Sequence, residues 1–304
     1  MKILVTGGRG VVGRPLSAEL EKRGHQVWLA DRMHSHEQNY FRFDVGEFHQ
    51  VERVLTMQDF DYVYHLAAEF GRRNGEDFYE NLWKANAIGT KNMIRMQERL
   101  NFRMIFFSSS EVYGDYRDVM YEDVMDKVAI KQMNDYAMSK WVNEMQILNS
   151  AAAFNTETVR VRLFNTYGPG EYYSDYRSVI CLFIYRALHD IPYTVYTDHK
   201  RTSSYVDDTV RTLANIIDNF KPGEVYNIAG SELHDMKQAS DIILDYLGKD
   251  DSLVEYRDKQ DDTTLLKLVD ASKAARDLGH ESTVPLVEGI KRTIEWQKGV
   301  YGIG

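Results

Sequence analysis

A glycine-rich segment near the N-terminus constrains the fold of this chain more than any other feature. The apolar run Lys2–Thr6 leads directly into residues 7–13, GGRGVVG, and a helical pattern follows. Glycines placed between a strand and a helix let the backbone turn tightly and approach a pyrophosphate closely. The unpaired N–H groups at the start of the helix add a partial positive charge. The residues expected to hold a dinucleotide here are Gly7, Gly10, Val11, Val12 and Gly13.

An acidic residue follows the second apolar run, Gln26–Ala30. A carboxylate at the end of this strand accepts hydrogen bonds from the adenosine ribose and repels the 2′-phosphate of NADP. Asp31 therefore predicts NAD as the cofactor. Arg32 follows Asp31 and is also placed beside the adenosine, although an arginine there can serve a phosphate.

Short apolar runs alternate with longer helical patterns through the first half of the chain. This alternation predicts βαβ units and an α/β fold with a Rossmann-type doubly wound parallel sheet. The further strands expected are Tyr62–Leu66, Met104–Ser108 and Glu157–Leu163, and the helices are Gly13–Arg23, Trp83–Leu100 and Asn134–Asn149.

The pattern changes after Leu163, where Tyr167-Gly168-Pro169-Gly170 breaks regular structure. A smaller, mixed α/β C-terminal lobe is expected beyond it, with a helix over Val179–Leu188 and a return to a buried strand at Val225–Ile228. We therefore predict a dinucleotide-binding domain of residues 1–163 plus about 204–229. Residues 164–203 and 230–304 would form the substrate-binding lobe.

Composition excludes several other classes of protein. The net charge of −9 argues against a nucleic-acid surface, which needs a basic stripe. Cys181 is the sole cysteine, so neither a disulfide nor a cysteine metal cluster can form, and no metal site is predicted. The apolar start is too short for a signal peptide, and no stretch approaches the length of a membrane span. These features favour the cytoplasm.

A tyrosine and a lysine four residues apart are the first candidates for catalysis. Tyr136 and Lys140 lie in a pattern with helical spacing, so both side chains share one face of the helix. A neighbouring ammonium and a cationic nicotinamide lower the pKa of a phenol and suit it to exchange a proton with a hydroxyl. Ser109, Ser110 and Glu111 follow the strand that ends at Ser108, where side chains face the ligand crevice of a parallel sheet.

Together these segments resemble the extended short-chain dehydrogenase/reductase family, in its nucleotide-sugar epimerase/dehydratase branch. The resemblance covers nearly the whole chain. Ser109, Tyr136 and Lys140 match its catalytic positions, and Tyr136 and Lys140 would also contact the cofactor. The matching cofactor segments contain Asp44, Val45, Leu66, Ala67, Ala68 and Asn86, and the matching substrate positions are Asn165 and Arg201.

This resemblance implies a reaction, a substrate class and an assembly. Tyr136 would deprotonate the 4-hydroxyl of a nucleotide-linked sugar while tightly held NAD accepts the hydride from C4. The resulting 4-keto sugar can be reduced again with inverted configuration, or it can first lose water or carbon dioxide. The family also implies a homodimer, and we expect apolar residues of Trp83–Leu100, including Ile88, Met93, Ile94 and Met96, to serve it.

The departures from the family pattern bear on which reaction of the nucleotide-sugar branch the chain would catalyse. Ser110-Glu111 replaces the Asp-Glu pair of typical 4,6-dehydratases and resembles the pair in sugar-nucleotide decarboxylases and GDP-mannose dehydratases. Simple 4-epimerases commonly have no carboxylate there, so Glu111 indicates a proton transfer beyond the step at C4, or else orders the loop. Gln260 stands where a second phosphate-binding arginine is frequent. Glu69 and Arg73 lie in a segment expected to line the site.

The leading hypothesis is therefore a nucleotide-sugar enzyme with Glu111-assisted dehydratase- or decarboxylase-type chemistry. A simple nucleotide-sugar 4-epimerase is the near alternative. A carbonyl reductase using external NAD(P)H is a more distant one, and Asn165 and Arg201 argue against it. A catalytically silent NAD-sensing protein is disfavoured because Tyr136 and Lys140 are both present.

Overall fold

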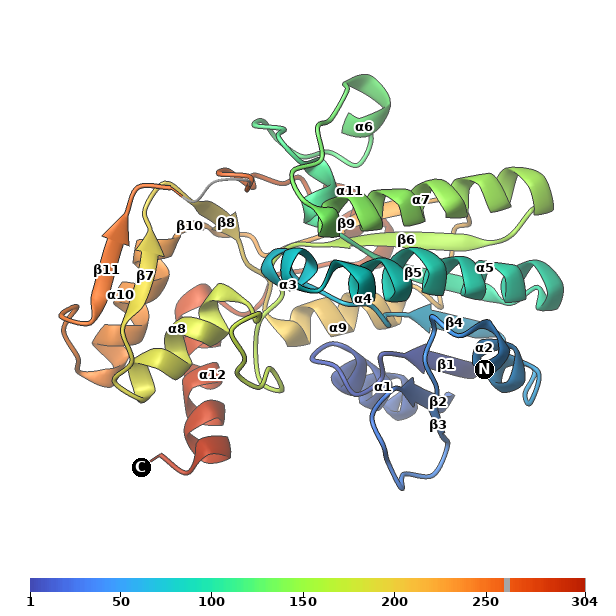
Figure 1. Ribbon diagram of the computed structural model, residues 1–304, viewed down its shortest axis with the longest axis horizontal. Coiled ribbons are helices and arrows are strands. Elements are labelled where there is room, and N and C mark those ends of the chain that lie inside the picture. Colours follow the sequence, from blue (N-terminus) through green and yellow to red (C-terminus); the bar gives the residue numbers. More distant parts are fainter. Residues whose placement is uncertain (260–262, 304) are drawn as a thin grey trace. The chain divides into compact units, whose positions relative to one another are not determined.

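A seven-stranded sheet joins strands from residue 2 to residue 228 of the chain (Figure 1). The computed structural model describes residues 1–259 and 263–303. The strand order is β3-β2-β1-β4-β5-β6-β9, and every pair from β3 to β6 is parallel. The strands are β1 (Lys2–Thr6), β2 (Gln26–Asp31), β3 (Tyr40–Arg42), β4 (Tyr62–His65), β5 (Arg103–Ser109), β6 (Thr158–Leu163) and β9 (Val225–Ile228). The predicted Rossmann-type α/β fold is confirmed.

Both faces of this sheet are buried, as the apolar character of its strands predicts. Leu4, Val63 and Met104 belong to one core with residues of α2 (Phe48–Leu55), α5 (Gly89–Leu100) and α7 (Asp135–Phe154). Successive side chains of a strand point to opposite faces, so Tyr64 points away from that core, and its hydroxyl donates to the Leu213 carbonyl at 2.9 Å. The helix α1 (Gly13–Lys22) connects β1 and β2.

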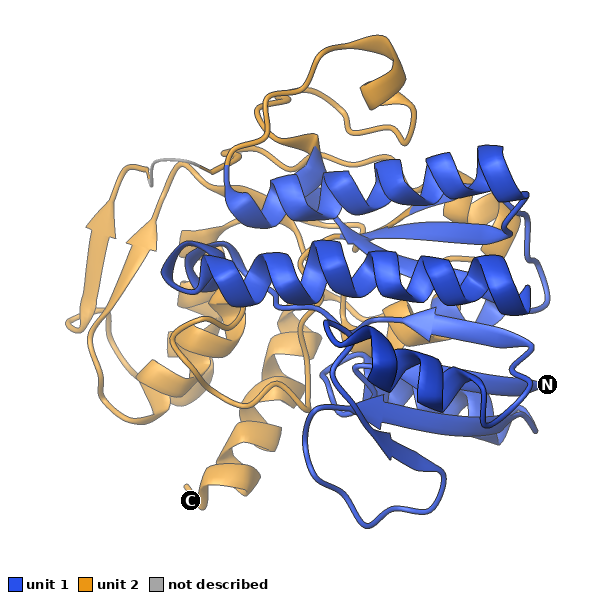
Figure 2. Cartoon of the chain, turned by 45° about the vertical axis from the view of Figure 1, so that its right-hand side comes forward, with its two compact units in different colours: residues 1–112, 134–163, 213–226 blue, residues 113–133, 164–212, 227–304 orange. Residues whose placement is uncertain are grey.

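The chain divides into two compact units (Figure 2). Unit 1 comprises Met1–Val112, Asn134–Leu163 and Leu213–Tyr226. Unit 2 comprises Tyr113–Met133, Phe164–Thr212 and the described residues of Asn227–Gly304. The chain passes between the units inside α9 (Val206–Asn215) and inside β9.

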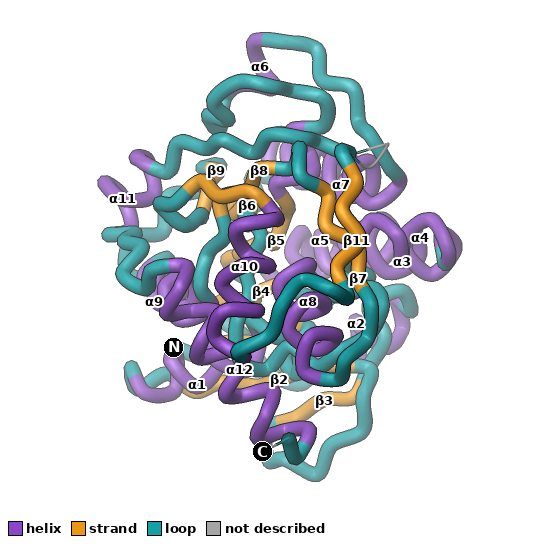
Figure 3. The backbone as a smooth tube through the Cα atoms, turned by 90° about the vertical axis from the view of Figure 1, so that its left-hand side faces the viewer, coloured by secondary structure: helices purple, strands orange, loops and turns teal. Residues whose placement is uncertain are grey.

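Unit 2 is built from short elements. Three of its helices pack against one another (Figure 3): α8 (Val179–Leu188), α10 (Met236–Leu247) and α12 (Leu286–Tyr301). Two strand pairs accompany them: β8 (Lys200–Thr202) lies antiparallel to β10 (Leu233–Asp235), and β7 (Tyr193–Tyr196) lies parallel to β11 (Val254–Arg257). Unit 2 also contains α6 (Val124–Lys127), α11 (Ser272–Leu278) and the first part of α9.

The helix expected over Trp83–Leu100 is interrupted. The chain forms α3 (Arg72–Asp77), α4 (Tyr79–Trp83) and a π-helical turn, Lys84–Ile88, before α5 begins at Gly89. A π turn widens a helix by one residue, and such turns are frequent at functional sites. Here the turn contains Asn86, whose amide serves the candidate site as described below. The prediction of one continuous helix is therefore wrong for residues 84–88.

Candidate active site

The carboxyl ends of four strands bring the predicted residues of unit 1 to one edge of the sheet. Thr6 at the end of β1 pairs with Ala30 on one side and His65 on the other. His65 in turn pairs with Phe106 of β5, and Ser109 ends that strand opposite Leu163. In open α/β sheets this edge is where ligands bind.

The glycine loop has no room for side chains at two positions. Gly7 adopts a left-handed φ of 67°, and a Cβ there would lie 2.9 Å from the Ala67 nitrogen. A Cβ on Gly13 would lie 2.3 Å from the Gly7 carbonyl oxygen. The loop therefore lies tightly against Leu66–Ala67 and leads directly into α1, as a phosphate-binding turn requires.

A buried histidine links this loop to α5. The Thr6 hydroxyl lies 2.9 Å from His65 Nδ1 and accepts the Ala67 N–H, while His65 Nε2 lies 3.2 Å from the Thr90 hydroxyl. Burial lowers the pKa of His65 to about 3, with a smaller effect from Lys140. The ring is thus neutral and positions the backbone. Sequence reasoning identified the strand but missed this network, although Thr6, His65 and Thr90 each stand in the segments it singled out.

The adenosine side of the site carries two ordered carboxylates. Asp31 accepts the N–H groups of Arg9 and Met33 at 3.2 and 3.3 Å. Asp44 accepts the Gly46 N–H at 2.8 Å. The Asn92 amide fixes the same segment by donating to the Val45 carbonyl at 2.8 Å. The glycine cradle and these carboxylates fit NAD.

The candidate catalytic residues also come together within unit 1. The helix α7 begins at Asp135, and the Asn134 side chain caps it by accepting the Ala137 N–H at 2.9 Å. Lys140 Nζ donates to the Phe107 carbonyl at 2.9 Å and lies 5.9 Å from the centre of the Tyr136 ring. The Ser109 hydroxyl accepts the Glu111 N–H at 3.2 Å, which folds Glu111 back toward the end of β5.

Burial dominates the protonation of both catalytic candidates. The pKa of Tyr136 is raised to about 12: burial is the largest cause, a hydrogen bond from Ser109 opposes the rise, and the charge of Glu111 adds to it. Burial also lowers the pKa of Lys140 to about 7, opposed by Glu144. The expectation that Lys140 lowers the pKa of the phenol is thus wrong for the protein by itself. Desolvation outweighs the ammonium, whose hydrogen bond is to a carbonyl.

A buried ion cluster lies one helical turn beyond Lys140. Glu144 is fully buried and accepts hydrogen bonds from Ser108 at 2.5 Å, Arg162 at 2.9 and 3.0 Å, and Arg160 at 3.1 Å. Burial alone would raise the pKa of Glu144, but the arginines and Ser108 outweigh it and lower the pKa. Sequence reasoning missed this cluster. The sequence feature that could have indicated the cluster is the pair Arg160 and Arg162, which stand at alternate positions of the mostly apolar strand β6.

The segment after β4 is held beside α7. The Asn86 amide accepts the Glu69 N–H at 2.9 Å, donates to the Glu69 carbonyl at 3.0 Å and donates to the Ser139 hydroxyl at 2.9 Å. A Cβ on Gly75 would lie 3.6 Å from Tyr136 Cβ, so α3 packs against the start of α7. Glu69 is half-buried and Arg73 is exposed. Asn86 therefore acts through Glu69 and α7.

The two predicted substrate residues of the C-terminal half lie in unit 2. Asn165 has a left-handed φ of 42°. Asn165 Nδ2 and Thr166 Oγ1 are buried and without a hydrogen-bond partner in the described part of the chain. Arg201 Nη1 donates to the carbonyls of Lys200 and Leu265 at 2.9 and 2.8 Å. Gln260 lies outside the described residues.

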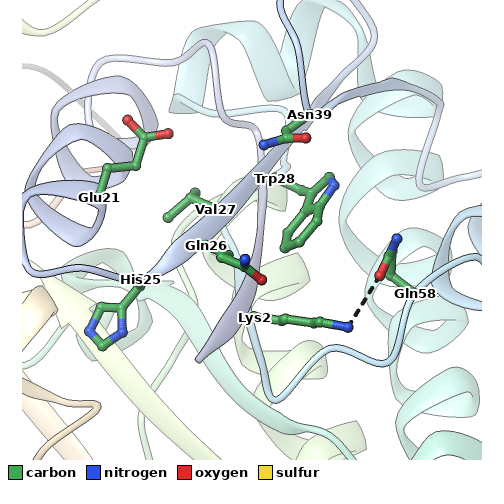
Figure 4. A pocket seen from close by; sticks show the side chains of 8 residues that line it. All are labelled: Lys2, Glu21, His25, Gln26, Val27, Trp28, Asn39 and Gln58. Atoms are coloured by element: carbon green, nitrogen blue, oxygen red, sulfur yellow. Dashed lines mark hydrogen bonds between the residues drawn. The ribbon is translucent and has the colours of Figure 1, made fainter.

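A shallow hollow occurs elsewhere in unit 1. It lies around the amino ends of β1 and β2, between Lys2, His25 and Trp28, so it is away from the ligand edge (Figure 4). Within the described residues, no group of histidines, cysteines and carboxylates could hold a metal ion. None of the described helices is long and apolar enough to cross a membrane.

The parallel sheet, the glycine loop and the Tyr136–Lys140 helix define a nucleotide-binding enzyme of the extended short-chain dehydrogenase type. Residues 3–229 match the model of the NAD dependent epimerase/dehydratase family, and the chain belongs to that family. Its relatives include decarboxylases, dehydratases and epimerases.

Individual relatives span nearly the whole chain. UDP-glucuronic acid decarboxylase 1 of Xenopus tropicalis is 30% identical over 97% of this chain and 72% of its own length. UDP-N-acetyl-alpha-D-glucosaminuronate decarboxylase of Bacillus cytotoxicus is 28% identical over 97% of both chains. An epimerase of Methanothermobacter thermautotrophicus has a similar structure, with a TM-score of 0.89, 26% identity and coverage of 99% of this chain and 93% of its own.

Proposed function

We propose that this protein oxidises the sugar of a nucleoside diphosphate sugar transiently at C4 and uses Glu111 for dehydratase- or decarboxylase-type chemistry on the 4-keto intermediate. The observation that carries the proposal is the position of Glu111 in the same site as Tyr136, close enough for its charge to raise the pKa of the phenol. An enzyme that only moves a hydride at C4 needs no second proton-transfer group at that place.

Tyr136 and Ser109 would act on the sugar 4-hydroxyl. Ser109, which hydrogen-bonds the phenol, would hold the hydroxyl, and Tyr136 would take its proton. When bound, NAD supplies the hydride acceptor and, in its oxidised form, a positive charge that opposes the effect of burial on the phenol. Lys140 donates a hydrogen bond to the Phe107 carbonyl and lies beside the tyrosine ring. It would hold the nicotinamide ribose and the phenol in position relative to each other.

Glu111 would act after the ketone has formed. A 4-keto sugar with a carboxylate on C5 is a β-keto acid, so its C5–C6 bond breaks, carbon dioxide leaves, and the electron pair moves into the C4 carbonyl. Glu111 would then protonate C5. In a 6-hydroxy sugar the same residue would instead remove the C5 proton and pass it to the 6-hydroxyl, which departs as water and leaves a C5–C6 double bond. In the decarboxylation the ketone is then reduced again, with the hydride returned to C4 and the proton returned by Tyr136. In a dehydratase the hydride is returned to C6, Glu111 delivers a proton from solvent to C5, and the ketone remains. No net redox change results in either case.

The decarboxylase form of this proposal has additional support. The relatives from Xenopus tropicalis and Bacillus cytotoxicus decarboxylate UDP-linked uronic acids, and the match extends over nearly the whole chain. The exposed Arg73, on the helix that packs beside Tyr136, is our candidate for a contact with the sugar carboxylate. The structural likeness to an epimerase keeps simple 4-epimerisation as the second candidate.

Unit 2 would hold the nucleotide part of the substrate. Asn165 and Thr166 each present a buried polar atom without a partner in the described part of the chain, and Asn165 holds a strained backbone conformation. Such features accumulate at ligand sites. Arg201 would contribute positive charge toward the diphosphate. We accordingly propose that unit 1 binds NAD and unit 2 binds the sugar nucleotide.

We also propose a homodimer formed through α7. Met93, Ile94 and Met96 do not serve such an interface, contrary to the sequence-based prediction, because all three are fully buried in the core of unit 1. Large apolar side chains on and next to α7 are exposed instead, as expected of an interface. They are Ile88, Met138, Met145, Leu148 and Phe154.

Mass spectrometry on a panel of UDP-, GDP-, dTDP- and CDP-linked sugars, including uronic acids, tests the proposed function. We expect one uronic acid substrate to lose carbon dioxide, or one neutral sugar to lose water. A product of unchanged mass with a new retention time would establish the epimerase. A carbonyl reductase would instead consume external NAD(P)H stoichiometrically.

A further inference from the structure

The adenosine edge of unit 1 carries opposing charges. Asp31 disfavours a 2′-phosphate on the ribose. However, Arg32 follows Asp31 in the chain, and the Arg9 N–H donates to the Asp31 carboxylate. Either arginine could bind such a phosphate. A guanidinium binds phosphate well because it presents several donors in a fixed plane. Discrimination against NADP by Asp31 therefore requires that these arginines be neutralised.

Each of these arginines is paired with a second carboxylate. Arg32 Nη2 lies 2.6 Å from Glu69 Oε1. Arg9 Nη1 lies 3.2 Å from Glu37 Oε1 and 2.9 Å from the Ser35 hydroxyl. Both arginines thus have a carboxylate partner in the protein before any cofactor phosphate could supply one.

Glu69 is the more firmly held of the two carboxylates. Its backbone is clamped on both sides by the Asn86 amide, and its Oε2 accepts the Asn74 amide at 3.2 Å. Its side chain is 22% exposed, whereas that of Glu37 is 44% exposed. Glu69 therefore keeps Arg32 in place without depending on the loop that carries Glu37.

We propose that Glu69, assisted by Glu37, is a specificity-determining residue for the cofactor: these two carboxylates neutralise Arg32 and Arg9, so that Asp31 can exclude NADP. The 2′-phosphate of NADP carries about two negative charges near neutral pH, and at this edge it would meet Asp31 and arginines that are already paired with carboxylates. This inference concerns the cofactor alone and holds for either sugar reaction considered above.

Isothermal titration of the cofactor-stripped protein with NAD and with NADP tests the inference without any sugar substrate. We expect the wild type to bind NAD at least about tenfold more tightly than NADP, roughly 1.4 kcal/mol. Glu69→Gln keeps the shape of the side chain and removes its charge. This variant should bind NADP at least about fivefold more tightly than the wild type, with the Kd of NAD changed less than about twofold.

The double variant Glu69→Gln/Glu37→Gln should bind NADP more tightly still, and added salt should reduce the gain because it screens charge. Glu52→Gln is the matched control, because Glu52 forms an exposed ion pair with Arg99 on α2 and α5. An unchanged Kd for NADP in both variants would overturn the inference. A parallel loss of both cofactors would also overturn it, since Glu69 would then only support the backbone. Neither result would bear on the sugar reaction.

Discussion

The phenol of Tyr136 is buried, and the protein by itself raises its pKa to about 12 through that burial. A tyrosine in such a site stays protonated until positive charge is added next to it, so in the proposed mechanism deprotonation of the sugar would be coupled to binding of the oxidised cofactor. This coupling prevents the phenolate from forming in the empty site, where it would have no proton to take.

Tyr136→Phe should therefore remove turnover and leave cofactor binding intact. Only the hydroxyl is lost, so we expect kcat to fall by roughly 10²–10⁴, as for removal of a general acid–base. The Kd of NAD, measured by titration, should stay within about twofold of the wild type. A variant that keeps most of its activity would show that another group takes the proton.

Lys140 gives a pH dependence of stability in the cofactor-free protein. Its pKa is lowered by burial from an ordinary 10.5 to about 7. Between these values the unfolded chain binds the proton and the folded chain does not, so the free energy of unfolding rises with pH. The cost of burying the ammonium is fully present below pH 7 and fades toward pH 10.5.

Lys140→Met removes this titration. Urea unfolding should show the variant more stable than the wild type near pH 6, roughly one unit below the folded pKa, and the advantage should shrink as the pH rises to about 9. An advantage that is constant over this range would mean that Lys140 does not titrate as the structure indicates.

At the scale of elements, α7 is tied to β6 by the buried ion cluster of Glu144, Arg160 and Arg162. Glu144→Gln leaves two buried guanidinium groups without their carboxylate, and removal of one partner of a buried pair costs about 3–5 kcal/mol. The loss should appear in urea unfolding of the variant. Glu157→Gln breaks the exposed pair with Arg103 and should cost less than about 1 kcal/mol. Equal effects of the two substitutions would contradict this account.

The strongly patterned elements were predictable from sequence, and the reasons are local. The strands β1, β4 and β5 are apolar runs bounded by turns, and α8 was placed at Val179–Leu188, where it occurs. The strand β3 has only three residues and so no periodicity to detect. The π turn of Lys84–Ile88 contains Asn86, which hydrogen-bonds Glu69 and Ser139, and no local pattern records such tertiary contacts.

In the candidate site, too, residues with a local sequence pattern were predictable and those placed by tertiary contacts were not. Tyr136, Lys140, Ser109 and Glu111 could be selected because each stands at a spacing or strand end with a chemical meaning. The partners of Glu69 could not, because Asn74, Asn86 and Arg32 reach it through tertiary contacts. The raised pKa of the phenol in the cofactor-free protein was also not predicted, since burial depends on the whole fold.

At the scale of the whole molecule, the exposed apolar residues of α7 predict association of two chains. One chain has a mass of 35.3 kDa, and light scattering at micromolar concentration should give about twice that mass. Leu148→Arg, on the outer face of α7, should yield monomers because it places a charge in the interface. Val287→Arg, on the exposed side of α12, is the control and should remain dimeric. A wild type that scatters as a 35.3 kDa particle would contradict the dimer.

The central claim is that Glu111 moves a proton at carbon after the sugar has been oxidised at C4. Turnover in deuterated water with the substrate found in the panel tests it most directly, using wild type and Glu111→Gln, which keeps the shape of the side chain but not its titrating proton. We expect the wild-type product to carry solvent deuterium. We expect the Glu111→Gln variant to show NADH absorbance and to form no finished product. Wild-type product free of deuterium, together with normal turnover of Glu111→Gln, would contradict it and establish a simple 4-epimerase.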